Sequence, residues 1–214
     1  MINIINKYYP EENALKRILL VHSRAVADKA LRICDAHPEL MLDRQFVEEA
    51  AMVHDIGIFR CDAPGIQCFG TEPYVCHGQI GAAIMRAEGY PRHARVCERH
   101  TGAGLTVEEI ISQHLPITIP PPPEDLSSSI SHLSSLISHL SSSISHLSSS
   151  ISPLSPWQPF LPETLEEQLI CYADKFFSKT RLEIEKTVEQ AERSLAKFGE
   201  AGVLRFRQWH ALFG

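Results

Sequence analysis

The sequence lacks the features that would direct it to a membrane or to nucleic acid. No stretch approaches about 18 apolar residues, so no transmembrane helix is expected. Residues 1–10 contain no long apolar segment of the kind found in a signal peptide. Acidic residues outnumber basic ones by 26 to 20, and the net charge of −6 gives no general attraction for nucleic acid. We therefore expect a cytoplasmic protein with neither a membrane nor a nucleic-acid partner, in which any bound phosphate needs a local positive site.

Motifs of several other protein classes are also missing. The six cysteines form no Cys-x-x-Cys pair, so they indicate reduced thiols rather than a thiolate zinc site. There is no P-loop and no Gly-x-Gly-x-x-Gly, and residues 102–104 (Gly-Ala-Gly) are too little to indicate a nucleotide cradle. No segment alternates between apolar and polar residues as a strand does.

Helical periodicity dominates the sequence that is present. Pro38 ends one helical pattern, Asp43 can cap the next, and Thr106 with Glu109 forms a capping-box pattern ahead of a short helix. Residues 59–76 hold Gly, Pro and Cys without a clear period, which predicts a loop. The expected fold class is therefore all-α, a helical bundle. The other expected helices span residues 11–20, 22–36, 44–55, 78–88, 91–100, 163–178, 181–197 and 200–212.

A tandem repeat interrupts this pattern after the four prolines at 120–123. Between residues 130 and 150, the motif Ile-Ser-His-Leu-Ser-Ser recurs with a period of seven. Ile and Leu fall where the a and d positions of a coiled coil would be, but serine fills most other positions and is a mediocre helix former. We interpret the repeat as a low-complexity insertion. A short amphipathic or self-associating helix is the alternative, with His132, His139 and His146 on one face.

The expected organisation is one domain with this insertion inside it. Residues 1–119 form its first part and residues 160–214 its last part, with the C-terminal helices. Residues 120–159 form the Pro-rich and Ser/Ile/His/Leu insertion between them. The sequence leaves a homo-oligomer open.

Ionisable residues recur on the apolar stripes of the predicted helices. His22 lies four residues from both Ile18 and Val26, and Asp174 lies four residues after Ile170. Burying such groups is costly unless they are paired or bind a metal. Six separate buried polar groups without a common partner would be unusual, so together they indicate one metal site. The six residues are His22, His54, Asp55, His77, His100 and Asp174.

This pattern resembles the HD superfamily of metal-dependent phosphohydrolases, in its His-Asp-Ile-Gly subgroup. It is most similar to the dinuclear group that hydrolyses symmetric diadenosine tetraphosphate. The resemblance covers about residues 14–118 and 160–180 and leaves out the repeat. It rests on His22, His54-Asp55-Ile56-Gly57, Cys76-His77-Gly78-Gln79-Ile80-Gly81-Ala82, His100-Thr101-Gly102 and Ala173-Asp174-Lys175.

The resemblance implies two divalent transition-metal ions, with His54 and Asp55 as the catalytic residues. Adjacent residues leave a helix in directions about 100° apart, so His54 and Asp55 can contact neighbouring ions. Imidazoles with carboxylates favour Fe, Mn, Co or Zn over Mg or Ca, and iron is the first expectation. Two such ions with two carboxylates leave a formal charge of +2, which can hold phosphate. The implied ligands are His22, His54, Asp55 and Asp174 for one ion and His77 and His100 for the other, with Asp55 bridging.

The implied reaction is hydrolysis of a phosphoester or phosphoanhydride bond in a nucleotide or dinucleotide polyphosphate. Two ions about 3.5–4 Å apart can share a hydroxide that attacks phosphorus. Substrate contacts are expected from Arg24, Thr101, Gly102 and Lys175. Two alternatives keep the same ligands: a di-iron oxygenase of the HD superfamily, and a nucleotide-binding module without turnover.

The remaining histidines of the predicted helices have weaker patterns. His93 shares a helix face with His100 and is a candidate auxiliary ligand, and His114 is a further candidate because it follows Ile111 at helical spacing. His37 and His210 are expected to be surface or packing residues.

Overall fold

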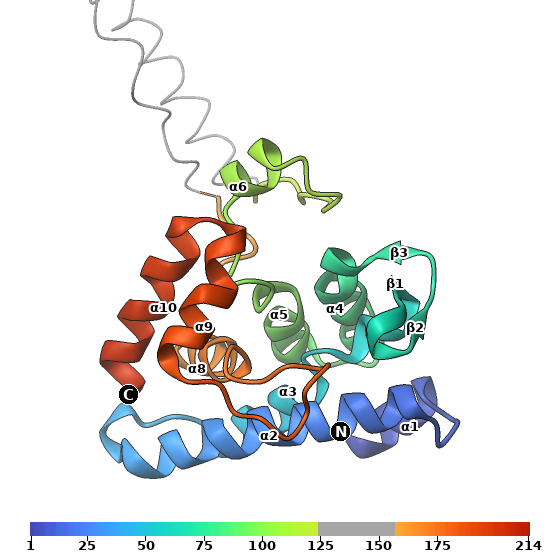
Figure 1. Ribbon diagram of the computed structural model, residues 1–214, viewed down its shortest axis with the longest axis horizontal. Helices are drawn as coiled ribbons and strands as arrows, with labels where there is room; N and C mark the ends of the chain where they lie inside the picture. The colour runs from blue at the N-terminus through green and yellow to red at the C-terminus, as the bar shows by residue number, and fades with distance from the viewer. Residues whose placement is uncertain (124–156) are drawn as a thin grey trace, which may run out of the picture.

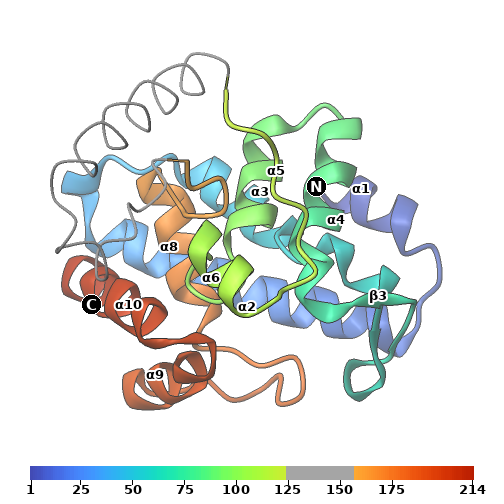
Figure 2. The same cartoon turned by 90° about the horizontal axis from the view of Figure 1, so that it is seen from above.

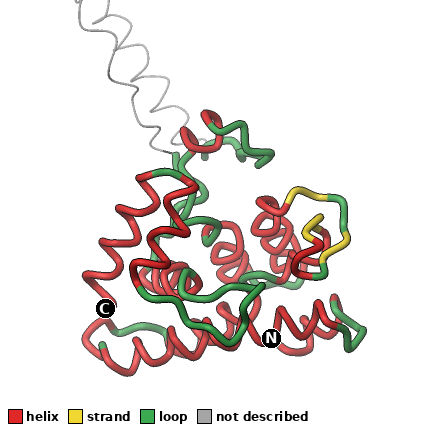
Figure 3. Tube along the Cα trace, in the orientation of Figure 1, coloured by secondary structure: helices red, strands yellow, loops and turns green. Residues whose placement is uncertain are grey.

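The computed structural model describes residues 1–123 and 157–214 of the chain. The interpretations of the repeat, including those of His132, His139 and His146, lie outside these residues. In the described part, helices dominate and short strands are confined to one side of the molecule (Figures 1 and 3). The all-α prediction is confirmed.

Most of the expected helices form close to their expected bounds. The N-terminal helix α1 was not expected, and α2 is a single helix rather than two, because nothing interrupts its backbone hydrogen bonds near residue 21. The region expected as one helix at 181–197 is irregular as far as residue 187. The helices are α1 (Ile2–Tyr8), α2 (Ala14–Ala36), α3 (Arg44–Val53), α4 (His77–Ala87), α5 (Pro91–Arg99), α6 (Val107–Ser112), α8 (Leu165–Asp174), α9 (Val188–Leu195) and α10 (Glu200–Phe213).

Side-chain caps fix several of these helix starts. The Asp43 carboxylate accepts from the backbone N–H of Phe46 at the start of α3, as expected. The predicted capping box of α6 is confirmed, since Thr106 and Glu109 bond to each other's backbone N–H groups. Thr164 begins α8 with the same device. This cap fixes the start of α8, the helix that ends at Asp174.

The region expected as a loop at 59–76 contains a small three-stranded sheet. Its strands are too short to show alternation of apolar and polar residues, so no strand could be predicted from this pattern. The middle strand pairs antiparallel with one neighbour and parallel with the other. The strands are β1 (Cys61–Ala63), β2 (Cys68–Phe69) and β3 (Glu72–Pro73), and the 3-10 turns are η1 (Pro38–Leu40), η2 (Ile56–Arg60), η3 (Pro64–Ile66), η4 (Tyr74–Cys76) and η5 (Ala196–Phe198).

The helices form a bundle laid across α2. In Figures 1 and 2, α5 lies between α4 and α8, and contacts both helices. Helix α2 packs on α3 and α8, while α10 packs on α8 and α9 packs on α10. Two large groups of buried apolar side chains result, one around α2, α8 and α10 and one around α1, η2 and α4. The chain segments that carry the six expected ligands meet between these two groups.

Two glycines allow the helices on one side of this junction to approach closely. A Cβ at Gly57 would lie 2.2 Å from the carbonyl oxygen of His77, and one at Gly78 would lie 2.5 Å from that of Cys97. Such separations are far inside van der Waals contact, so η2, α4 and α5 need glycine at these positions. In the described part of the chain, no helix is long and apolar enough to cross a membrane.

Candidate metal centre

The middle of α2 and the end of α8 bring the first two ligand candidates together. His22 is 1% exposed, and its Nε2 lies 2.9 Å from Oδ1 of Asp174. Asp174 is the last residue of α8, and its carboxylate is also buried. These residues are 152 positions apart in sequence, and the packing of α2 on α8 joins them.

His54 and Asp55 lie where the chain leaves α3 and enters the 3-10 turn η2. Both side chains are fully buried. The Nδ1 of His54 donates to the carbonyl oxygen of Ala51 at 2.6 Å, which directs its Nε2 toward the carboxylates. That Nε2 lies 3.1 Å from Oδ2 of Asp55 and 3.5 Å from Oδ1 of Asp174. The two adjacent side chains therefore contact each other within one site.

His77 and His100 approach from the other side of Asp55. His77 begins α4, and its Nδ1 donates to the carbonyl oxygen of Tyr74 at 2.6 Å. His100 follows α5, and its Nδ1 donates to the carbonyl oxygen of Cys97 at 2.8 Å. The Tyr74 ring stacks on His77 at a centroid distance of 4.7 Å, which holds this imidazole in place.

The two Nε2 atoms of His77 and His100 lie only 3.0 Å apart, and neither can donate to the other. A carbonyl oxygen can only accept, so each Nδ1 carries the proton and each neutral ring presents a lone pair at Nε2. Burial and the neighbouring His100 lower the pKa of His77 to about 3, which opposes a proton between the rings. Two facing lone pairs fit a bound cation, and backbone-anchored Nδ1 atoms are typical of metal-ligating histidines.

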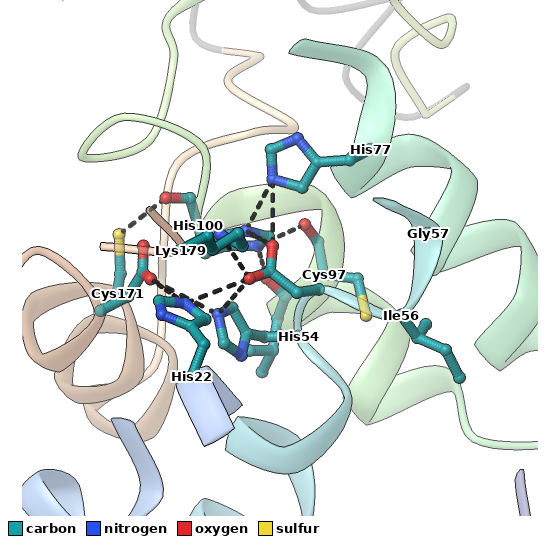
Figure 4. Close-up of polar contacts among 12 residues, drawn as sticks. His22, His54, Ile56, Gly57, His77, Cys97, His100, Cys171 and Lys179 are labelled. Atoms are coloured by element: carbon teal, nitrogen blue, oxygen red, sulfur yellow. Dashed lines mark hydrogen bonds and ion pairs between the residues drawn. The ribbon is translucent and has the colours of Figure 1, made fainter. Parts of the chain in front are cut away.

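Asp55 lies between two groups of histidines. Figure 4 labels these histidines. Its Oδ1 is 3.4 Å from Nε2 of both His77 and His100, and it has no hydrogen-bond partner among the described residues. Its Oδ2 is 3.2 Å from Nε2 of His22. One carboxylate therefore presents one oxygen to each group.

The donor atoms form two sets that share Asp55. In each set, every potential ligand atom lies within 4.8 Å of the others, which is compatible with a single bound ion. Nitrogen and carboxylate donors together fit divalent transition metals. The sets are His22, His54, Asp55 and Asp174, which we call the His22 half, and Asp55, His77 and His100, which we call the His77 half.

The His22 half is charged and internally paired when no metal is bound. Burial lowers the pKa of His54, but Asp55 and Asp174 outweigh this effect and raise it to about 9. Burial likewise disfavours ionised Asp55, yet Lys179 and His54 hold the pKa of that carboxyl well below its usual range. Protonated His54 therefore stabilises the two carboxylates until a metal replaces its proton.

Two lysines contact the carboxylates from the segment after α8. Lys175, an expected substrate contact, lies 2.7 Å from Oδ2 of Asp174 and donates to the carbonyl oxygen of His100 at 2.9 Å. Lys179, which the sequence analysis did not single out, lies 2.6 Å from Oδ2 of Asp55 and is labelled in Figure 4. No helical period connects Lys179 to Asp174, because the chain is irregular between α8 and α9. The sequence therefore held no signal for it.

A pocket opens beside these lysines and encloses about 740 Å³ of space that protein atoms do not fill, part of it open to solvent. Its walls include aromatic and basic side chains as well as His77, His100 and Asp174. Of the expected substrate contacts, Thr101, Gly102 and Lys175 line it. Arg24 does not line this pocket. This side chain lies on the exposed side of α2, where it pairs with Glu48 at 3.0 Å and Asp28 at 3.3 Å.

The other histidines and the cysteines lie outside the two sets. His93 packs against Phe46 with its Nε2 3.5 Å from Glu49, and His114 is exposed with a φ of 51°. His37 pairs with Glu39 at the surface, and His210 bonds to Tyr172 in the packing of α10 on α8. All six cysteines are free and buried, which fits the expectation of reduced thiols.

The sequence is similar to known proteins over most of its length. The HD domain model matches residues 19–178, which include all six residues of the two sets. An uncharacterized protein of Methanocaldococcus jannaschii, MJ0778, is 28% identical over 197 residues, which cover 87% of this chain and 86% of that protein. No solved structure matches the chain.

Two further relatives are named as methyltransferases. A tRNA (cytidine(56)-2'-O)-methyltransferase of Picrophilus torridus is 30% identical over 186 residues, which cover 82% of this chain and 39% of the enzyme. The enzyme of the same name from Thermoplasma volcanium is 25% identical over 173 residues, which cover 80% of this chain and 35% of that protein. The chain therefore spans between a third and two fifths of the length of these methyltransferases.

Proposed function

This chain belongs to the HD domain family, and on that premise we propose that it is a metal-dependent phosphohydrolase acting on a nucleotide or dinucleotide polyphosphate. The observation that carries the proposal is the pair of facing lone pairs on His77 and His100, 3.0 Å apart and joined to the His22 half through Asp55. A cation is the partner that this arrangement lacks.

The ligand assignment follows the two sets of donor atoms. The His22 half and the His77 half would each hold one divalent ion, with iron, manganese, cobalt or zinc as the candidates. When bound, such ions supply an activated water and positive charge for the phosphoryl oxygens. Asp55 belongs to both halves, and Lys175 keeps the Asp174 carboxylate oriented through its 2.7 Å contact.

The walls of the pocket support a phosphorylated aromatic ligand. Lys175, Lys179 and Lys186 carry positive charge that can pair with phosphate oxygens, and Phe177 and Phe198 offer apolar faces to a base. Symmetric diadenosine tetraphosphate is the first substrate to test, because the motifs are most similar to the group that hydrolyses it. The names of the methyltransferase relatives add nucleotides derived from tRNA to the substrates worth testing.

The test is a reconstitution experiment. Protein purified without oxygen is stripped by chelation, reloaded with Fe²⁺, Mn²⁺, Co²⁺ or Zn²⁺, and assayed for product release from a panel of nucleotide polyphosphates. We expect hydrolysis with at least one metal, and its loss in His54→Ala. His93→Gln is the matched control, because His93 is also buried but lies outside both sets.

Other results would contradict the proposal in identifiable ways. Full activity after exhaustive chelation would rule out a metal-dependent reaction. Oxygen consumption without hydrolysis of any nucleotide polyphosphate would indicate an oxygenase, and tight nucleotide binding without product would indicate a module without turnover.

A further inference from the structure

The pocket beside the metal centre is strongly basic in a chain of net charge −6. Among the described residues that line it, Asp174 is the only carboxylate. Buried cations are costly unless something neutralises them, so each ammonium group near the centre requires a partner. The lysines that line the pocket are Lys175, Lys179, Lys186 and Lys197.

Lys175 and Lys179 use the two aspartates of the centre in different ways. Lys175 contacts Oδ2 of Asp174, while the histidines face Oδ1 of the same carboxylate. Its contact therefore leaves the oxygen that faces the histidines free. Lys179 contacts Oδ2 of Asp55, which is also the oxygen nearest to His22 and His54, at 3.2 and 3.1 Å. An ion held by the His22 half would meet the Lys179 ammonium at that oxygen.

A cation at the His22 half would repel the ammonium of Lys179 at close range. Two positive charges at close range repel more strongly where the effective dielectric constant is below that of water. The Lys179 side chain is only 12% exposed, so little water screens this repulsion. Metal binding therefore favours a state in which Lys179 leaves Asp55, and this state needs a new anionic partner for the lysine.

Lys186 has no anionic partner among the described residues. Its ammonium donates to the carbonyl oxygen of Lys175 at 3.2 Å, and it forms no ion pair with any described carboxylate. The residue is half-buried at the pocket wall. Burial lowers the pKa of Lys186; the charge of Asp174 opposes this, while the neighbouring lysines lower the pKa further. A positive group that is both half-buried and unpaired fits an anion in the pocket.

We propose that Lys175, Lys179 and Lys186 form a subsite for the second phosphate of a diphosphate unit, and that Lys179 is a displaceable counter-ion of Asp55 that moves to this phosphate when metal binds. The proposal rests on the proposed function, because the first phosphate is the one placed at the metal centre. Since coupling between two bound ligands is reciprocal, the proposal requires that metal and diphosphate each tighten the binding of the other by the same factor.

The Lys179 part is tested with Mn²⁺ alone, by titration of stripped protein with free Mn²⁺ followed spectroscopically. We expect Lys179→Gln to bind Mn²⁺ at least tenfold more tightly than wild type in the absence of any phosphate, because the competing ammonium is gone. If Lys179 only supports the structure of the site, the variant binds Mn²⁺ equally or more weakly, and this result would overturn the role assigned to Lys179.

The subsite is tested with two probes that the enzyme cannot hydrolyse, methylenediphosphonate and methylphosphonate, titrated into Mn²⁺-loaded protein by calorimetry. We expect methylenediphosphonate to bind at least tenfold more tightly to wild type. Lys186→Gln should remove this advantage and leave methylphosphonate binding unchanged. Arg193→Gln is the matched control, since Arg193 is an exposed cation on α9 outside the pocket wall.

The outcomes separate this proposal from the proposed function. Equal binding of the two probes to wild type, or an advantage that survives in Lys186→Gln, overturns the subsite even if the enzyme hydrolyses nucleotides. Selective binding of methylenediphosphonate without any hydrolysis supports the subsite and contradicts the phosphohydrolase.

Discussion

The two halves of the metal centre share Asp55 but differ in what they do without metal. In the His22 half, the carboxylates have positive partners, because His54 has a pKa raised to about 9 and Lys179 lies 2.6 Å from Asp55. In the His77 half, the pKa of His77 is lowered to about 3 and two lone pairs face each other at 3.0 Å. In the first half, positive groups balance the buried carboxylates, whereas in the second half two neutral imidazoles turn their Nε2 atoms toward each other.

The same residue types, histidine and aspartate, therefore differ in charge state between the two halves. We expect an ion in the His22 half to replace the proton of His54 and, by our proposal, the ammonium of Lys179, so that its affinity depends on pH and on the other ligands of the pocket. The His77 half is preorganised by two backbone carbonyl oxygens and by the stacked ring of Tyr74. We therefore expect an ion there to need no such exchange.

Asp55→Asn should have the largest effect, because it removes the one ligand that belongs to both halves. We expect metal content to fall from two ions per chain to well below one, and the rate of substrate hydrolysis to fall by about 10³-fold or more, as for loss of a principal electrostatic group. The measurements are metal analysis and a product assay on the same sample. Retention of both ions would show that the halves are independent.

The folded state of this variant has to be verified separately. Asparagine has nearly the same shape as aspartate, so circular dichroism and the melting temperature of the chelated protein should stay close to wild type. If the variant loses its helical circular-dichroism signal, its metal content does not report on the ligands. His93→Gln measures how much an unrelated buried substitution lowers the melting temperature.

Two histidine substitutions should affect the stability of the metal-free protein in opposite directions. His77→Gln removes one of two facing lone pairs and places an amide N–H donor near His100, so it should stabilise by about 1 kcal/mol. His22→Gln removes the 2.9 Å contact with Asp174 and should destabilise by about the same amount. Denaturant unfolding of chelated protein measures both. Shifts of the same sign would contradict the difference between the halves.

Metal binding to the His22 half should depend on pH through His54. Its pKa of about 9 in the folded protein lies above the unfolded value of 6.5, so at pH 7 an ion must displace one proton. We expect the affinity for the ion in this half to rise about tenfold per pH unit from pH 7 to pH 9 and then to level off. The His77 half should show no such rise. Metal titrations at several pH values, in wild type and in His77→Gln, measure the slope.

The same shift affects the stability of the metal-free protein with the opposite sign. Because the folded pKa of His54 is raised, its contribution is fully present below pH 6.5 and is lost as pH rises through 9. Raising the pH therefore weakens the metal-free fold while it strengthens metal binding. A metal affinity in the His22 half that is flat across this range would show that His54 is already neutral.

Arg24→Gln should have the smallest effect. This residue lies only two positions from His22, yet its guanidinium pairs with Glu48 on the exposed side of α2. We expect metal content unchanged and kcat/KM for any hydrolysed substrate within twofold of wild type, because surface ion pairs contribute little. A loss of tenfold or more would place Arg24 in substrate binding.

The sequence predicted the parts of this structure that depend on helical periodicity. His22 and Asp174 could be singled out because each occupies a core-facing position on a regular helix. Burying an ionisable group there is costly unless it is paired or binds a metal. Most helix bounds were predicted for the same reason. The six side chains do converge, although they come from five separate segments of the chain.

The parts that the sequence did not predict lack any period. Lys179 and Lys186 lie in the irregular segment between α8 and α9, where no pattern says which way a side chain points. The strands β1 to β3 are two or three residues long, too short for alternation to be visible. Arg24 lies two positions from His22 but pairs with Glu48 on the exposed side of α2, because closeness in sequence to a ligand does not decide on which side of a helix a residue lies.

We propose that two ions act together on a phosphorylated substrate. The most direct measurement adds metal back to stripped protein in steps, and determines bound metal and the hydrolysis product in the same samples. We predict that product formation rises mainly with the second ion per chain and is absent before any metal binds. Full product formation with one ion per chain, or product formed by the stripped protein, would contradict a reaction that needs both ions.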